Sequence, residues 1–103
     1  MTPFQENKAL LTDLYELTMA ASYFENHMAA PATFSLFVRK YPPGRAYLVA
    51  AGLDDVLTYL EGFQFSETDL AYLDRSGLFS EGFLKYLTTL RFTGTVRALP
   101  EGD

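Results

Sequence analysis

The residues best suited to chemistry in this 103-residue chain form two small groups, Asp13 with Tyr15 and Arg39 with Lys40. Tyr15 falls in the first turn of an expected helix, where backbone N–H groups have no helical partner and attract anions. An aromatic ring beside unpaired donors could hold a flat, negatively charged ring. The alternative is that Tyr15 packs in the interior with its hydroxyl satisfied, as buried tyrosines usually do.

Arg39 and Lys40 are adjacent cations at the end of an expected strand, just before a Pro-Gly turn. Such a pair could clamp a phosphate or pyrophosphate. Because side chains alternate between the two faces of a strand, at most one of the pair would share a given pocket. The alternative is that both are solvated charges, which contribute little to stability.

Other polar groups give weaker indications of a site. Asp54 and Asp55 could suggest a metal, but adjacent carboxylates at a helix start usually interact with the helix dipole. His27 is the one histidine and has no neighbouring Cys, His or paired Asp, which is poor support for a metal site or a triad. The sequence contains no phosphate-binding glycine loop, dinucleotide fingerprint or HExxH motif. We therefore expect no metal site and no catalytic residue in this chain.

Composition narrows the class of protein. Hydrophobic residues make up 49% of the chain and charged residues 20%, which is typical of one small globular domain. A net charge of −5 argues against a nucleic-acid partner, and zero cysteine removes disulfides and thiolate chemistry. No apolar run has the length of a signal peptide core or a membrane span, so we expect a soluble, cytoplasmic protein. With 7 Tyr and 9 Phe, we expect some aromatic side chains to cover a partner surface.

Four helices are expected from periodicity and capping signals. The first runs over Leu10–Asn26, with Asp13 as N-cap and Glu16 three positions later, close to a capping box. The second follows Gly52 and stops near Gly62, the third opens at Ser66 and ends at Gly77, and the fourth opens at Ser80. The apolar positions expected to face a core are Leu14, Leu17, Ala21, Phe24, Leu53, Val56, Leu57, Leu60, Leu70, Leu73, Phe83, Leu84, Leu87 and Leu90.

Alternating residues predict strands between these helices. Residues 32–40 and 47–51 would form a hairpin around the turn at residues 41–45, and residues 93–99 would add a further strand. The predicted fold class is therefore α+β, a short antiparallel sheet packed by about four helices. The last strand enters a turn at residues 100–103 and has no partner after it, so we expect a single domain over residues 1–103 that is truncated at its C-terminal end.

Five collinear runs carry a resemblance to a known family. They are Thr12-Asp-Leu-Tyr-Glu-Leu-Thr-Met19, Phe34-Ser-Leu-Phe-Val-Arg-Lys40, Tyr47-Leu-Val-Ala-Ala-Gly-Leu53, Gly77-Leu-Phe-Ser80, and Phe92-Thr-Gly94 with Pro100-Glu-Gly102. Together they resemble the N-terminal segment of nicotinate phosphoribosyltransferases. Those enzymes are several times longer and are implied to carry a larger barrel-like catalytic domain, which this chain lacks.

The resemblance implies an enzyme of NAD salvage, a glycosyltransferase that joins nicotinate to 5-phosphoribosyl 1-diphosphate with coupled ATP hydrolysis. It implies a homodimer with the site at the interface, and Mg²⁺ and ATP for the full-length enzyme, none of them bound by this segment alone. The implied substrate-binding residues are Tyr15, Asp13, Arg39 and, less directly, Lys40. The family's phosphorylated histidine is expected downstream and is not assigned to His27.

Two alternatives stay open beside this interpretation. The chain could be a non-catalytic module that retains the helices and sheet for dimerisation or small-ligand binding, a reading that exposed aromatic residues would also fit. Within the enzymes, a nicotinamide-using relative is the close competitor. The form of residues 12–19 is more similar to the nicotinate branch.

Overall fold

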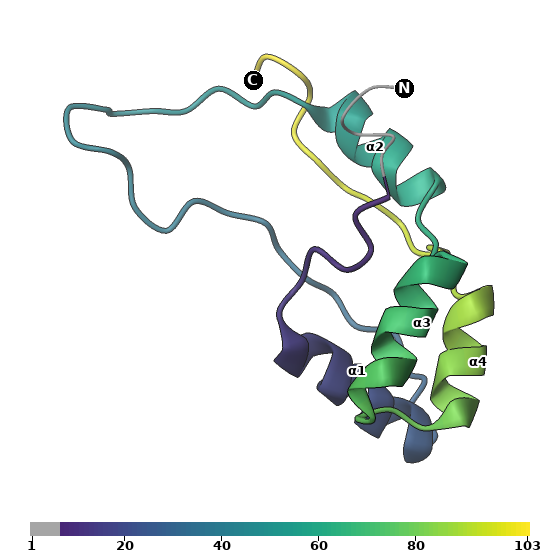
Figure 1. Ribbon diagram of the computed structural model, residues 1–103. Helices are drawn as coiled ribbons and strands as arrows, with labels where there is room; N and C mark the ends of the chain where they lie inside the picture. The colour runs from purple at the N-terminus through teal and green to yellow at the C-terminus, as the bar shows by residue number, and fades with distance from the viewer. Residues whose placement is uncertain (1–6) are drawn as a thin grey trace.

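The computed structural model describes residues 7–103, so residues 1–6 of the expected domain lie outside the described part. Within it the chain forms four helices, α1 (Leu14–Glu25), α2 (Leu53–Glu61), α3 (Glu67–Ser76) and α4 (Glu81–Thr89). Helices α3 and α4 lie side by side and α1 packs against α4, whereas α2 stands at the other end of the molecule (Figure 1).

Local capping explains why α3 and α4 begin where they do. The Ser66 hydroxyl accepts from the Asp69 N–H at 3.1 Å, and the Asp69 carboxylate accepts from the Ser66 N–H at 2.9 Å, so the predicted capping box is confirmed. Ser80 caps α4 by accepting from the Phe83 N–H. Helix α3 ends at Gly77, whose φ of 72° suits a residue without a Cβ.

Helix α1 ends in a Schellman motif that places His27 in the left-handed region. The Met28 N–H donates to the Tyr23 carbonyl at 2.8 Å and the His27 N–H donates to the Phe24 carbonyl at 3.2 Å. His27 has a φ of 54°, the one positive φ of a non-glycine residue among residues 7–103. Its place in the described structure is thus the end of a helix.

A small aromatic core holds α1, α3 and α4 together. Its buried members are Ala9, Phe65, Leu73, Phe79, Phe83 and Leu87, with Leu17, Ala21, Phe24, Leu70, Leu84 and Leu90 packed partly buried around them. Phe83 is 0% exposed and meets Phe24, Phe79 and Tyr86 ring to ring. The predicted apolar face of α4 is confirmed. The predictions for Leu14 and Val56 are wrong, because their side chains are 55% and 44% exposed.

The predicted sheet is wrong: residues 7–103 contain no strand, and the α+β class is not what the chain adopts. Residues that were expected to alternate toward a core are solvent-exposed instead, with Phe34 at 91% and Leu36 at 98%. A two-stranded hairpin is marginal by itself, because strand backbone needs partners on its ladder and one face against a core. In the described chain, residues 32–40 and 47–51 have neither a neighbouring strand nor a core surface against one face. Residues 93–99 are extended but form no strand either.

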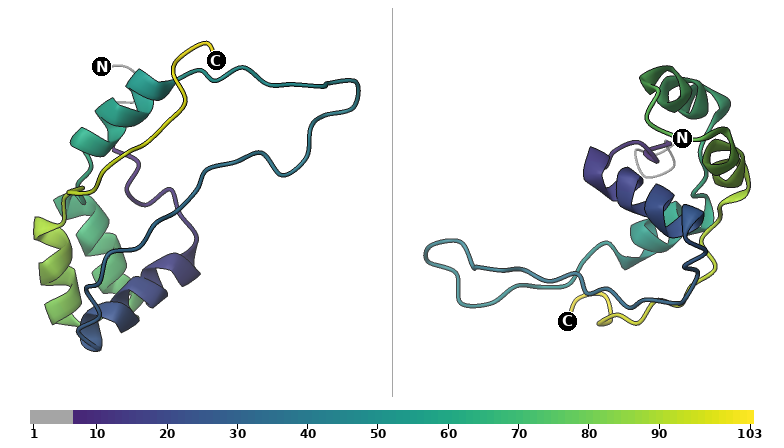
Figure 2. Two further views of the ribbon diagram at one scale, coloured as in Figure 1. Left: turned by 180° about the vertical axis from the view of Figure 1, so that it is seen from behind. Right: turned by 90° about the horizontal axis from the view of Figure 1, so that it is seen from below.

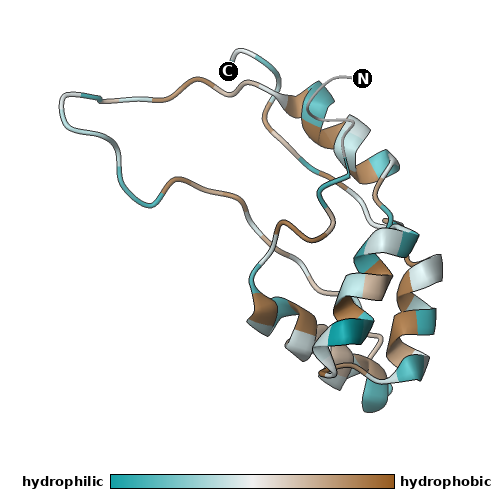
Figure 3. Ribbon diagram, in the orientation of Figure 1, coloured by the Kyte–Doolittle hydropathy of each residue, from teal (hydrophilic) through white to brown (hydrophobic). Residues whose placement is uncertain are grey.

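In place of the hairpin, residues 28–51 form a long extended segment, here called the arm, which leaves the helices and returns to α2 (Figures 1 and 2). Parts of it are strongly hydrophobic although they project from the rest of the chain (Figure 3). The radius of gyration is 16.5 Å, whereas a compact domain of this length has about 13 Å. The arm accounts for this excess, because it is the part of the chain that is drawn away from the helices.

Candidate functional site

The start of α1 carries the first predicted group. Asp13 occupies the N-cap position, as predicted, but its side chain makes no capping hydrogen bond. The Glu16 carboxylate accepts from the Thr12 hydroxyl and does not return to the N-cap backbone, so the capping box expected here is wrong. The first turn is closed by the Asp13 carbonyl, which accepts from the Glu16 N–H at 3.1 Å.

Tyr15 stands beside open backbone donors on this turn. Its side chain is 60% exposed, so the alternative of a tyrosine packed in the interior does not hold in this structure. Within residues 7–103 the N–H groups of Leu14 and Tyr15 have no acceptor, which is the usual state of a helix start without a side-chain cap. The exposed Tyr15 ring and the two N–H groups lie at the N-terminal end of α1, where the helix dipole is positive. Together they can bind a flat anion.

The aromatic surface continues along the same side of α1. Tyr15, Met19 and Tyr23 follow each other at four-residue spacing and are all exposed, at 60%, 46% and 45%. Residues four apart lie on the same face of a helix. This exposed row faces away from the core that Leu17 and Phe24 join, so α1 is apolar on two sides.

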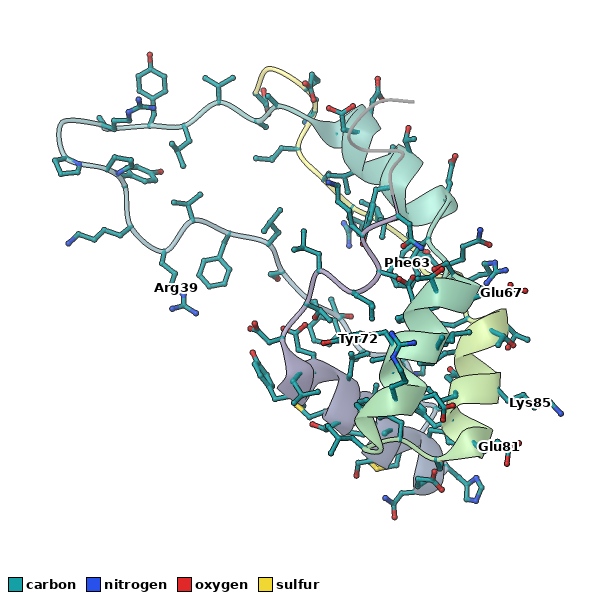
Figure 4. The ribbon with its side chains drawn as sticks, in the orientation of Figure 1. Arg39, Phe63, Glu67, Tyr72, Glu81 and Lys85 are labelled. Carbon is teal, nitrogen blue, oxygen red and sulfur yellow. The ribbon has the colours of Figure 1, made fainter. Side chains whose placement is uncertain are left out.

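Arg39 and Lys40 lie far along the arm. Both are exposed, and Figure 4 shows Arg39 projecting from the arm, apart from the helices. In the described part of the chain, no hydrogen bond or ion pair joins either cation to Asp13 or Tyr15. The arm has a strong local charge: Arg39, Lys40 and Arg45 fall in a stretch with no Asp or Glu from residue 26 to residue 53. The chain thus presents a cationic arm and an aromatic helix start as two separate surfaces.

A third polar arrangement was missed by the sequence analysis. The Glu101 carboxylate accepts from the Gly52 N–H at 2.9 and 3.1 Å and from the Leu53 N–H at 3.2 Å, at the start of α2. These two backbone donors lower the pKa of Glu101. A signal was available: Gly52 at the N-cap has no side-chain oxygen, so the acceptor for the helix start had to come from elsewhere.

Other candidate groups do not form a site. Asp54 and Asp55 lie in the first turn of α2, where their carboxylates interact favourably with the positive end of the helix dipole. Residues 7–103 bring together no group of three or more side chains that could ligate a metal, and none of their helices is long and apolar enough to cross a membrane. Burial raises the pKa of Tyr59, whose hydroxyl donates to the Lys8 carbonyl at 3.4 Å, away from both predicted groups.

Comparison with known proteins identifies the class of domain. Residues 10–103 match the family profile described as nicotinate phosphoribosyltransferase (NAPRTase) N-terminal domain. No solved structure matches the chain.

Individual relatives agree with that class. The chain is 55% identical over 94 residues to nicotinate phosphoribosyltransferase pncB2 of Mycobacterium tuberculosis, covering 91% of this chain and 20% of the relative. It is 41% identical over 101 residues to the human nicotinate phosphoribosyltransferase, covering 93% and 19%. It is 38% identical over 99 residues to the Bacillus subtilis enzyme of the same name, covering 95% and 20%. The chain belongs to the nicotinate phosphoribosyltransferase family, and it spans about a fifth of the length of these relatives.

Proposed function

We propose that this chain is the N-terminal part of an enzyme that joins nicotinate to 5-phosphoribosyl 1-diphosphate, giving nicotinate mononucleotide and diphosphate with coupled ATP hydrolysis. The observation that carries the proposal is the family match over residues 10–103, together with the exposed Tyr15 beside open donors inside the first matching run. By itself the chain is expected to be inactive, because its two candidate groups lie apart and it spans a fifth of the relatives' length.

Tyr15 is proposed to stack on the pyridine ring of nicotinate. Its ring is accessible, and the free N–H groups of Leu14 and Tyr15 lie at the end of the helix that attracts a carboxylate. Asp13 is proposed to fix the geometry of this turn through its carbonyl, which accepts from the Glu16 N–H. Holding the ring in one orientation helps its nitrogen to reach the sugar carbon, since a positioned reactant needs less reorganisation.

Arg39, with Lys40 beside it, is proposed to contact the phosphates of the ribose donor. Two cations on an arm without acidic residues attract a polyanion, and a guanidinium can bind phosphate oxygens in pairs. Because the arm lies apart from α1 in one chain, we propose that a homodimer brings Arg39 of one subunit to the site of the other. The donor phosphates would then be neutralised from both subunits.

Mg²⁺ and ATP belong to the proposed reaction of the complete enzyme. Mg²⁺ would neutralise charge on the leaving diphosphate. We assign none of residues 7–103 to either, since the described carboxylates do not gather into a ligand set. We also propose that the protein works in the cytoplasm, where the substrates of NAD salvage are found.

The proposal can be tested in a chimera in which residues 10–103 replace the matching segment of the Mycobacterium tuberculosis relative. We expect the chimera to form nicotinate mononucleotide. Tyr15→Ala should raise the KM for nicotinate about tenfold or more, because one base-sized stacking contact contributes roughly 1–3 kcal/mol. Tyr23→Ala on the same helix is the control and should change the KM little, since Tyr23 lies two turns away from the open donors.

Two results of that experiment would count against the proposal. A folded, dimeric chimera that makes no product would remove the enzyme assignment. Equal kinetics for Tyr15→Ala and the parent chimera would remove the stacking role. For Arg39→Ala, we expect the KM for 5-phosphoribosyl 1-diphosphate to rise while the KM for nicotinate stays nearly constant.

A non-catalytic module for dimerisation or small-ligand binding is the second candidate. The observation that favours it is the exposed apolar surface of the arm, with Phe34 at 91%, Phe37 at 70% and Tyr47 at 74%. Soluble monomers rarely expose such a run of large apolar side chains. Sedimentation of the chain alone, with and without nicotinate, separates this candidate from the enzyme, because a module would dimerise or bind without further sequence.

A further inference from the structure

Hydrogen bonds join the last turn of the chain to the end of the arm next to α2, although the bonded residues lie far apart in the sequence. The Ala50 N–H donates to the Asp103 carbonyl at 2.8 Å, and the Gly102 N–H donates to the Ala50 carbonyl at 2.7 Å. Beside this backbone pair, the Glu101 carboxylate takes the N–H groups of Gly52 and Leu53. We call these contacts the latch.

The latch is one of the sets of hydrogen bonds that attach this end of the molecule; another is the bond from the Tyr59 hydroxyl on α2 to the Lys8 carbonyl. Helix α2 buries no residue and is not packed against another helix, and the arm has no strand partner within the described residues. Gly52 has a φ of 98° and therefore sits in a conformation that turns the chain sharply from the arm into α2. The direction in which the arm leaves α2 thus depends on what holds Gly52.

We propose that Glu101 is a positioning residue that caps α2 from the last turn and thereby fixes the end of the arm. Its side chain supplies the acceptor that Gly52 lacks, and its two donors are successive N–H groups of one helix start. An outside anion is disfavoured at the same place, because the carboxylates of Asp54 and Asp55 stand in the first turn and both donors are already taken. Since Arg39 lies on the same arm, the latch would also help to place it; that consequence rests on the proposed function, whereas the latch itself does not.

Hydrogen exchange tests the latch directly. In the 103-residue chain, Glu101→Gln keeps the side-chain length but removes the charge, and charged acceptors form roughly twice as strong a hydrogen bond as neutral ones. We expect the amides of Gly52 and Leu53 to exchange about three- to tenfold faster in Glu101→Gln than in the parent chain. Glu101→Asp keeps the charge but is one methylene shorter, and should exchange faster than the parent as well.

Glu61→Gln is the matched control, because it removes the same charge from the other end of the same helix. Its amides at Gly52 and Leu53 should exchange at the parent rate. Equal rates in Glu101→Gln and the parent would overturn the proposal. So would equal acceleration in Glu61→Gln, since the effect would then be one of net charge.

The position of the arm provides a second readout. The chain has no cysteine, so Ala46→Cys on the arm and Lys85→Cys on α4 give two unique sites for spin labels. We expect Glu101→Gln to broaden the distance distribution between the labels and Glu61→Gln to leave it unchanged. An unchanged distribution in Glu101→Gln would show that the arm is held by other contacts and would overturn the positioning role. Neither measurement requires catalysis, so the latch can fail while the proposed function stands, and the reverse.

Discussion

Phe83 is the residue whose loss should affect the fold most. It is 0% exposed on α4, and its ring lies 5.8 Å from that of Phe24, 5.7 Å from that of Phe79 and 6.4 Å from that of Tyr86. Phe83→Ala removes a fully buried ring and opens a cavity between α1, α3 and α4, which costs about 3–5 kcal/mol in the free energy of unfolding. Domains have only about 5–15 kcal/mol in total, so this single change should remove much of the stability.

Urea unfolding followed by circular dichroism at 222 nm measures this loss. Phe37→Ala is the matched control: Phe37 is 70% exposed on the arm, and its truncation should change the free energy of unfolding by less than about 0.5 kcal/mol. If Phe83→Ala is already unfolded without urea, Phe83→Leu keeps most of the apolar volume and should lose about 1 kcal/mol. A loss below about 1 kcal/mol for Phe83→Ala would refute the packing described for this core.

Two further predictions concern the helix starts. Ser66→Ala breaks the capping box with Asp69 and should lower the free energy of unfolding by about 1 kcal/mol, measured by urea titration. The pKa of Glu101 is lowered in the folded chain, so its contribution to stability is fully present above its ordinary pKa and is lost as the pH falls through the lowered value. The protection of the Gly52 amide, which is how much more slowly it exchanges than an unprotected amide at the same pH, should therefore fall from about pH 5 downward.

Each of these has its own control. Ser35→Ala removes an exposed hydroxyl from the arm and should leave the unfolding midpoint in place; an equal shift in both serine variants would contradict the capping argument. Asp54 and Asp55 in the first turn of α2 and Asp103 beside Glu101 are further carboxylates at this end of the molecule. The comparison is therefore made against Glu101→Gln, in which the loss of protection on acidification should be much smaller. A parent and variant with the same pH profile would rule out Glu101 as the titrating group.

The sequence predicted those features that depend on neighbouring residues. A serine before a helical pattern places its hydroxyl within reach of the N–H three residues later, so the starts at Ser66 and Ser80 could be predicted from spacing alone. The apolar face of α4 followed from its period, because a helix of nine residues can bury only one side. The five matching runs likewise predicted the family, which the comparison confirmed.

The sequence could not establish the pairing of distant segments. Alternation over residues 32–40 and 47–51 predicts which side chains would lie on each face of a strand. A strand forms, however, only where a partner backbone accepts its hydrogen bonds and another surface covers its apolar face. The described chain supplies neither, so Phe34 and Leu36 are exposed on an arm. For the same reason the sequence predicted the candidate site residues but not the distance between them. Tyr15 lies on α1 and Arg39 on the arm, and the position of the arm relative to α1 depends on the tertiary structure.

Glu101 illustrates the boundary between the two kinds of information. In the sequence it is one residue of a Pro-Glu-Gly turn, and its distance from Gly52 along the chain hides any relation between them. Local sequence determined the helices, the caps of α3 and α4 and the apolar face of α4, because each depends on residues only a few positions apart. Tertiary structure alone decided that the arm forms no strand, that Ala50 bonds to the last turn and that Glu101 caps α2, because each depends on which distant groups come within hydrogen-bonding distance.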